Sequence, residues 1–153
     1  MDIRLIDAQD SAVVSLIQEA DEYASSLYPP ESNHLESIAA LEKPNVAFFG
    51  AYIDEELAAC GAVKILEEDA PYGEVKRVFV LEQHRGRALA KAIMGRIECH
   101  LIESGIGVCR LETGVKQAEA LGLYRTLGYV ERGPFGSYVA DPLSVFMEKN
   151  LVA

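Results

Sequence analysis

The order of hydrophobic and polar positions in the first third of the chain predicts a strand and two helices. The run from Ile3 to Ile6 has the alternation of a short strand. Apolar residues then recur at helical spacing between Val13 and Leu27. The run Tyr28-Pro29-Pro30 ends this helix, because proline cannot continue a helix and restricts the residue before it. A second, shorter helix is expected from Leu35 to Leu41.

The rest of the chain predicts a strand-rich segment followed by two helix-containing units. Two β-rich runs separated by a short acidic turn indicate a hairpin, and a polar loop with Pro71 and Gly73 precedes the next strand. A later helix carries apolar residues four apart and ends at a pair of glycines. The expected elements are strands at Val46–Ile53, Leu57–Leu66, Glu74–Val80, Val108–Glu112, Tyr129–Glu131 and Ser144–Glu148, a helix bearing Leu89, Ile93, Ile97 and Leu101, and a helix at Gln117–Leu127.

This order of elements, β-α-α-β-β-β-α-β-α-β-β, predicts the fold class. A hairpin-rich first half followed by two β-α units is typical of an α/β protein with a mixed sheet and helices on both faces. The chain has 153 residues and contains no repeat, low-complexity tract or linker. That length suits one domain with a substantial core, so we expect residues 1–153 to form a single domain.

The acidic composition excludes several classes of partner. Lys and Arg number 14 and Asp and Glu number 24, which gives a net charge of −10. Affinity for nucleic acids or for an anionic membrane surface rests on basic residues, so neither is an expected partner. A cationic substrate such as an amine is compatible with this charge.

Targeting signals and cysteine usage indicate a cytoplasmic protein. The N-terminal residues are acidic where a signal peptide needs positive charge and an apolar run. No apolar stretch approaches the roughly 20 residues that a membrane span requires. Cys60, Cys99 and Cys109 are odd in number and lack metal-ligand spacing, so they indicate reduced thiols. We expect no metal site.

The segment from residue 74 to 94 contains a candidate phosphate site. An apolar strand leads into a short loop and then into a helix, whose first backbone N–H groups and dipole favour an anion. Gly86, Ala88 and Ala90 let the backbone approach a ligand, and Arg85 and Arg87 add positive charge. An ordinary turn with solvated arginines remains the alternative. The P-loop and dinucleotide-binding patterns are absent.

This segment resembles the acyl-CoA signature of the GNAT superfamily of N-acetyltransferases. Residues 80 to 90 read VLEQHRGRALA, and the family pattern is R/Q-x-x-G-x-G/A between a strand and a long helix. The preferred register starts at Arg85, which puts Ala88 at the first glycine and Ala90 at the second small position. A second register starts at Gln83. Both place the pyrophosphate in the same loop, and Ala88 is a departure that bears on how closely the ligand approaches.

A second motif supports the resemblance, which covers about residues 2 to 150. Residues 112 to 135 are similar to the family's helix after the fifth strand, with the pattern N-x-x-A-x-x-L-Y-x-x-x-G-F/Y. Those positions are Gln117 (in place of Asn), Ala120, Leu123, Tyr124, Gly128 and Tyr129. The resemblance implies a mixed, mostly antiparallel sheet of six to seven strands, flanked by helices and splayed between the fourth and fifth strands.

The resemblance also implies an acetyl-CoA site and an acyltransferase chemistry. The implied contacts to acetyl-CoA are Val78, Phe79, Val80, Arg85, Gly86, Arg87, Ala88, Leu89, Ala90, Gln117 and Tyr124. A backbone N–H near Val78 would stabilise the oxyanion. Tyr124 matches the family's general acid, although its apolar helix is also compatible with a core aromatic residue. Glu74 is the first candidate for the general base and Glu112 the second. His34 and His84 are further options, with His84 expected to be solvent-exposed.

The acceptor is expected to be a primary amine of a small molecule or peptide. Its candidate contacts are Tyr28, Pro29, His34, Glu112 and Tyr138, which lie in the segment after the first long helix, at the end of a strand and in the late loop. Two other functions remain open: a non-catalytic acyl-CoA-binding sensor or partner domain, and a protein that binds a different phosphorylated ligand. The family also suggests a possible homodimer.

Overall fold

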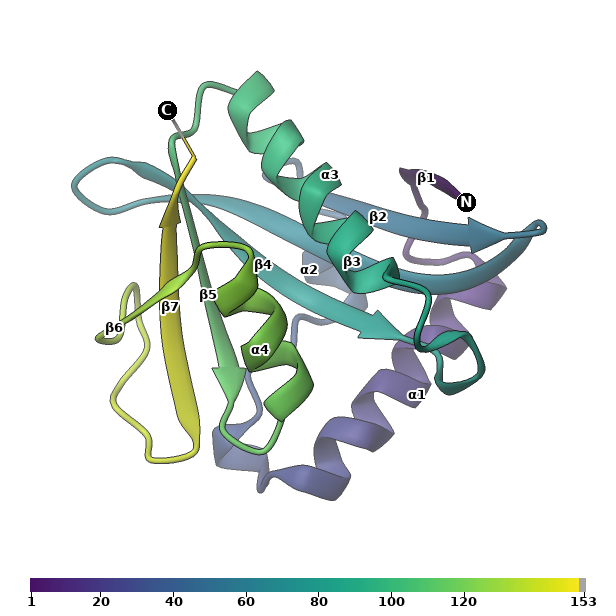
Figure 1. The fold of residues 1–153 in the computed structure, drawn as a ribbon, viewed down its shortest axis with the longest axis horizontal. Coiled ribbons are helices and arrows are strands. Elements are labelled where there is room, and N and C mark those ends of the chain that lie inside the picture. The colour runs from purple at the N-terminus through teal and green to yellow at the C-terminus, as the bar shows by residue number, and fades with distance from the viewer. Residues whose placement is uncertain (152–153) are drawn as a thin grey trace.

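The computed structural model describes residues 1–151 and is built on one seven-stranded sheet with the order β1-β2-β3-β4-β5-β7-β6 (Figure 1). The strands are β1 (Asp2–Leu5), β2 (Val46–Ile53), β3 (Glu56–Glu67), β4 (Pro71–Val80), β5 (Val108–Gly114), β6 (Val130–Arg132) and β7 (Ser144–Asn150). The helices are α1 (Ser11–Leu27), α2 (Ile38–Leu41), α3 (Leu89–Glu103) and α4 (Ala118–Thr126). Every expected element is present.

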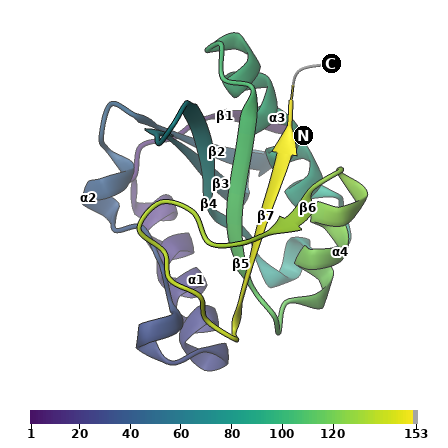
Figure 2. The same cartoon turned by 90° about the vertical axis from the view of Figure 1, so that its left-hand side faces the viewer.

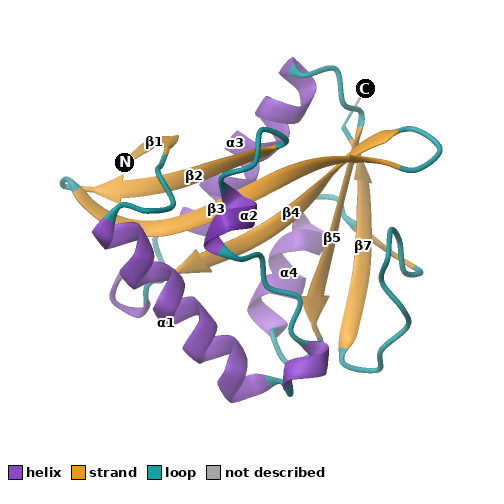
Figure 3. Ribbon diagram, turned by 180° about the vertical axis from the view of Figure 1, so that it is seen from behind, coloured by secondary structure: helices purple, strands orange, loops and turns teal. Residues whose placement is uncertain are grey.

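Helices cover both faces of the sheet. Figure 1 shows α3 and α4 on one face, and Figure 3, seen from behind, shows α1 and α2 on the other. Each face has its own apolar core, because the periodic residues identified in the sequence are buried against it. On α3 these are Leu89, Ile93, Ile97 and Leu101, and on α1 they are Val13, Leu16 and Ile17.

The sheet is antiparallel except between β4 and β5, which run parallel. Within the described residues these two strands pair at only two positions, Gly73 with Cys109 and Glu74 with Arg110. Beyond them the strands diverge (Figure 1). The predicted mixed sheet with a splay between the fourth and fifth strands is therefore confirmed.

Most predicted boundaries lie within two residues of the observed ones, but two are wrong by three residues. The second helix starts at Ile38 rather than Leu35, because the Ser37 side chain caps it by accepting a hydrogen bond from the Ala40 N–H at 3.1 Å. Strand β4 starts at Pro71 rather than Glu74. Proline is tolerated as the first residue of a strand, and the Leu101 side chain fills the space beside Gly73 that a Cβ atom would need.

From residue 1 to residue 151, no helix combines the length and the apolar character needed to cross a bilayer. All three cysteines are free thiols, as the sequence predicted: Cys60 and Cys109 are buried and Cys99 is exposed.

Candidate active site

A cleft of about 740 Å³ lies where β4 and β5 diverge. Its walls come from the end of α1, the segment after it, the second half of β4, the loop before α3, the end of β5 and the start of α4. Most of the predicted site residues line it: Tyr28, His34, Val78, Phe79, Val80, Arg85, Gly86, Ala88, Leu89, Ala90, Glu112, Gln117 and Tyr124. Pro29, Glu74, Arg87 and Tyr138 do not.

The loop before α3 has the geometry of an anion site. Gly86 and Ala88 both have left-handed backbone conformations, with φ of 84° and 58°. Ala88 is the N-cap of α3 and supplies no side-chain cap, so the first N–H groups of this helix have no side-chain acceptor at its start. Uncapped N–H groups at a helix N-terminus attract phosphate. The departure at Ala88 is therefore compatible with this loop, at the cost of a left-handed alanine.

The cleft is cationic although the protein is acidic. Lining residues include five basic side chains, Lys76, Arg77, Arg85, Lys91 and Lys116, and two acidic ones, Glu112 and Glu119. Lys76 and Arg77 pair with Glu74 and Asp21, which within residues 1–151 leaves three unpaired cations against two carboxylates. The protein as a whole has a net charge of −10. A positive cleft in a negative protein concentrates an anionic ligand. The residues present thus fit a ligand with a pyrophosphate group.

A β-bulge turns β4 where it borders the cleft. The register with β3 shifts between Cys60 and Ala62, and Arg77 on the opposing strand has a φ of 59°. The Arg77 guanidinium donates to the Glu36 carbonyl at 2.9 and 2.6 Å and pairs with the Asp21 carboxylate. Its side chain is only 4% exposed. Sequence reasoning missed this residue; its one signal is a second cation beside Lys76 in the same strand.

Tyr124 lies in the cleft wall on α4. Its ring packs edge-on to Tyr129, with centroids 5.9 Å apart. Among residues 1–151 no side-chain or backbone group hydrogen-bonds its hydroxyl. Burial raises the pKa of the Tyr124 phenol, so the hydroxyl stays protonated at neutral pH. A protonated phenol without a protein partner, facing a cleft, is available to donate a proton.

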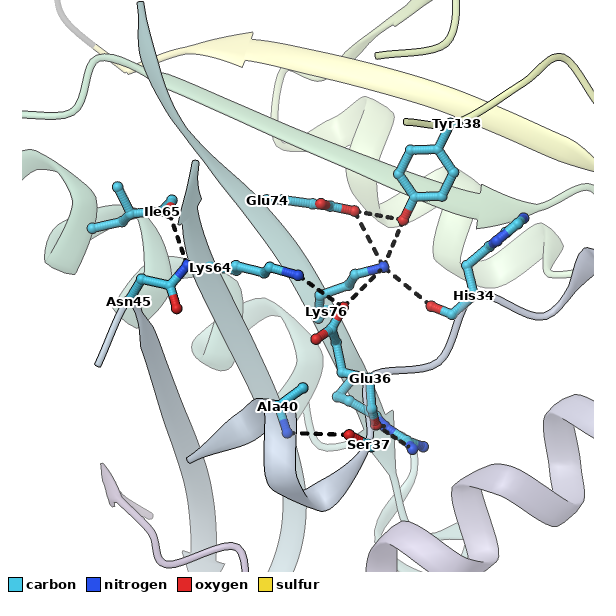
Figure 4. A network of polar contacts seen from close by, with 11 residues as sticks. His34, Glu36, Ser37, Ala40, Asn45, Lys64, Ile65, Glu74, Lys76 and Tyr138 are labelled. Carbon is cyan, nitrogen blue, oxygen red and sulfur yellow. Dashed lines mark hydrogen bonds and ion pairs between the residues drawn. The ribbon is translucent and has the colours of Figure 1, made fainter. Parts of the chain in front are cut away.

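Glu112 and Glu74, the two predicted candidates for a base, differ in their surroundings. Glu112 lines the cleft and forms no ion pair with any described residue. Burial raises the pKa of its carboxyl, opposed in part by the neighbouring Ser144 hydroxyl. Glu74 is 4% exposed and already engaged, because Lys76 lies 3.2 Å away and the Tyr138 hydroxyl donates to it at 2.5 Å (Figure 4). Glu112 is thus the carboxylate that a substrate can reach.

Three other predicted residues have defined positions. The Tyr28 hydroxyl accepts a hydrogen bond from the Lys116 N–H at 3.1 Å, which ties the end of α1 to the turn after β5. The His34 ring packs edge-on to Tyr138, with centroids 5.0 Å apart. The expectation of an exposed His84 is wrong: it is 6% exposed and shares a 2.9 Å hydrogen bond with the Glu56 carboxylate, beside the anion-binding loop.

The fold and the cleft define a class of protein, an acyl-CoA-dependent transferase. The chain belongs to the GNAT acetyltransferase family, whose model matches residues 13–129, and it is an N-acetyltransferase. Members of this family use acetyl-CoA.

Individual relatives agree with this assignment. The IAA acetyltransferase of Azospirillum brasilense is 46% identical over 92% of this chain and 91% of its own. A solved structure from Klebsiella pneumoniae is 33% identical with a TM-score of 0.81, covering 99% and 97% of the two chains. The PaiA N-acetyltransferase of Thermoplasma acidophilum, solved with coenzyme A, shares the fold at 18% identity with a TM-score of 0.77, covering 97% and 98%.

Proposed function

We propose that this protein transfers an acetyl group from acetyl-CoA to the primary amine of a small molecule, by direct attack while both substrates are bound. One observation carries the proposal: the anion-binding loop, Tyr124 and Glu112 all line the same cleft. This arrangement brings together a site for the phosphates, a proton donor and a free carboxylate. A protein that only sensed acyl-CoA would not need the last two.

The binding mode of acetyl-CoA follows from the geometry of the loop and of β4. The pyrophosphate accepts N–H groups at the start of α3, from Leu89 and Ala90, with Arg85 and Lys91 balancing its charge. The pantetheine arm lies along Val78 to Val80, where β4 has left β5 and its backbone faces the cleft. Such pairing extends a sheet edge with a ligand in place of a strand.

Each proton in the transfer has an assigned group. The neutral amine attacks the thioester carbonyl, and its surplus proton passes to Glu112, whose raised pKa suits a base. A backbone N–H near Val78 stabilises the oxyanion. The C–S bond then breaks, and Tyr124 donates a proton to the departing thiolate of coenzyme A. The amide product leaves with the acetyl group, Glu112 releases its proton to solvent, and Tyr124 regains one from solvent.

The charge around the acceptor end supports an amine as acceptor. Lys76 and Lys64 pair with Glu36, and Lys76 also pairs with Glu74, so these four charges cancel. Glu112, at this end of the cleft, is then free to attract a cationic ligand. Because the Azospirillum relative is an IAA acetyltransferase, IAA belongs in the acceptor panel beside the amines.

The test is release of thiol from acetyl-CoA with a panel of primary amines and IAA, together with calorimetric titration of acetyl-CoA. Wild type should release thiol with at least one amine, and Tyr124→Phe should bind acetyl-CoA normally but turn over slowly. Binding without turnover for every acceptor would establish the sensor function instead. Competition by ATP or NAD as effective as that by coenzyme A would favour a different phosphorylated ligand.

A further inference from the structure

The wall of the cleft on the α1 side is a strap, defined here as residues 32–36. It runs between a one-turn 3₁₀ helix at Pro30–Ser32 and α2, and it pairs with no strand of the described sheet. Ser32, Asn33, His34 and Leu35 line the cleft. The position of the strap therefore depends on side-chain and carbonyl contacts rather than on a ladder of backbone hydrogen bonds.

Two cations of β4 anchor the strap: the Arg77 guanidinium, which donates to the Glu36 carbonyl, and the ammonium group of Lys76. The ammonium group donates to the His34 carbonyl at 3.1 Å and lies 3.7 Å from the Glu36 carboxylate (Figure 4). The same nitrogen donates to the Tyr138 hydroxyl at 2.5 Å and pairs with Glu74 at 3.2 Å. The Lys76 side chain is 10% exposed. An ammonium group has three donors, so these partners leave Lys76 no free donor for a ligand.

The late loop between β6 and β7 meets the strap at this lysine. Figure 2 shows the loop passing β5 towards the segment that follows α1. Tyr138 contacts the strap through Lys76 and through the His34 ring. A second tie lies nearby, where the Ser32 hydroxyl donates to the Asp141 carboxylate at 2.7 Å. The loop thus supports the strap from outside the cleft, which explains why Tyr138 is close to the acceptor end but does not line it.

We propose that Lys76 is a positioning residue that fixes the strap and thereby limits the acceptor to small amines. This inference rests on the proposed function. With the strap held by Lys76, Arg77 and Asp141, it forms a wall of the acceptor end that includes His34. Extended acceptors such as peptides meet that wall, whereas a short amine reaches Glu112. The part of the cleft that holds acetyl-CoA lies on the far side, along α3 and the second half of β4, and does not depend on these ties.

The test compares Lys76→Met with Lys64→Met. Lys64 also pairs with Glu36, at 3.3 Å, but it contacts neither His34 nor Tyr138 and does not line the cleft. Both variants lose one positive charge from the same network. Steady-state kinetics use butylamine, phenethylamine and a short peptide with a free N-terminus, and calorimetry measures acetyl-CoA binding.

Lys76→Met should raise the KM for butylamine about tenfold and leave the KM for acetyl-CoA within about twofold. Relative kcat/KM for phenethylamine and the peptide should rise, because a loosened strap admits them. Lys64→Met should change neither the two KM values nor the relative kcat/KM by more than about threefold. Equal effects of Lys76→Met and Lys64→Met would overturn the inference. So would a rise in the KM for acetyl-CoA as large as that for butylamine in Lys76→Met.

A second variant guards against loss of folding, because Lys76→Met leaves Glu74 without its cation. Tyr138→Phe keeps every charge and the ring packing and removes only the hydroxyl link. It should shift the acceptor preference in the same direction, and an unchanged preference counts against the inference. A wild type that binds acetyl-CoA but acetylates no amine rejects the proposed function itself, which is a different result from turnover with an unaltered preference.

Discussion

The Tyr28 hydroxyl occupies the space beside Gly114 in which any larger residue would need to place its Cβ atom. Both residues line the cleft, and their contact joins the residue after α1 to the end of β5. Gly114→Ala should therefore displace Tyr28, break its hydrogen bond with Lys116 and destabilise the fold by about 1–3 kcal/mol. Thermal unfolding should show the loss as a decrease in Tm of about 2–4 °C per kcal/mol.

Gly95→Ala is the matched control for that measurement. Gly95 lies within α3, and a Cβ atom there would contact nothing within 4 Å. Alanine favours a helix interior over glycine by about 1 kcal/mol, so this variant should be more stable than wild type. Two glycine substitutions with opposite signs would establish that the contact with Tyr28, rather than loss of glycine as such, causes the effect. A stable Gly114→Ala variant would contradict the described packing.

The anion-binding loop predicts different effects for its two arginines. Arg85 lines the cleft and Arg87 does not. Arg85→Glu should weaken acetyl-CoA binding about tenfold or more, which corresponds to about 1.4 kcal/mol, and Arg87→Glu should have a smaller effect. Calorimetric titration at two salt concentrations measures both affinities. Equal losses in the two variants would mean that general charge, and not the position of Arg85, governs binding.

Ala88→Gly tests the backbone conformation of the same loop. A left-handed φ strains alanine and not glycine, so the variant should be more stable by about 0.5–1 kcal/mol and should retain acetyl-CoA binding. Ala88→Val should lose both stability and binding, since a β-branched side chain is poorly tolerated there. Chemical denaturation and calorimetry provide the two readouts. Tolerance of valine would be incompatible with the left-handed conformation.

Two neighbouring tyrosines separate proton donation from structural support. Tyr124→Phe should lower kcat about 100-fold or more and leave Tm unchanged, because it removes no protein hydrogen bond. Tyr129→Phe should do the opposite. The Tyr129 hydroxyl donates to Glu98 at 2.9 Å and contacts the Cys109 thiol at 3.1 Å, and its loss should cost about 1–2 kcal/mol of stability. Full activity in Tyr124→Phe would remove this residue from the mechanism.

The ionisation of the Glu112 carboxyl should determine how the rate falls on the acid side of the pH–rate profile. The carboxyl must be ionised to accept a proton, and burial raises its pKa above the ordinary value of 4.5. The rate should therefore fall as pH decreases through that raised pKa, and Glu112→Gln should lose both the limb and most of the activity. Initial rates measured between about pH 5 and pH 9 test the effect.

Glu112→Gln should lower activity without lowering the stability of the fold. A carboxyl whose pKa is raised on folding binds its proton more tightly in the folded state, so its ionisation lowers stability as pH rises. Glu112→Gln removes that cost and should not lower Tm at neutral pH. Loss of activity accompanied by a fall in Tm at neutral pH would assign Glu112 a structural role instead.

Local sequence patterns predicted most of the fold, because they depend on neighbouring residues. The apolar face of α3 and the proline stop after α1 are of this kind. The start of α2 was missed because Glu36, which lies inside the expected helix Leu35–Leu41, instead pairs with Lys64 and Lys76 on distant strands. Contacts of that range leave no trace in a local pattern.

The site residues that the sequence predicted are likewise those that belong to a local motif. Arg85, Gly86 and Tyr124 were identified from two motifs, and all three line the cleft. Glu74 was ranked above Glu112 by its place at the start of a predicted strand. The sequence does not show that Lys76 and Tyr138 already engage Glu74. Arg77 was missed for a similar reason, since its partners Asp21 and Glu36 are 56 and 41 residues away.

The two residue pairs that join β4 to β5 make the sheet two leaves held at a hinge. One leaf contains β1 to β4 and the other contains β5 to β7. A ligand that pairs with β4 in the opening bridges both leaves and acts as a non-covalent cross-link. Bound acetyl-CoA should therefore stabilise the folded enzyme. At a free ligand concentration of 100 times the Kd, binding adds about 2.7 kcal/mol to the free energy of unfolding.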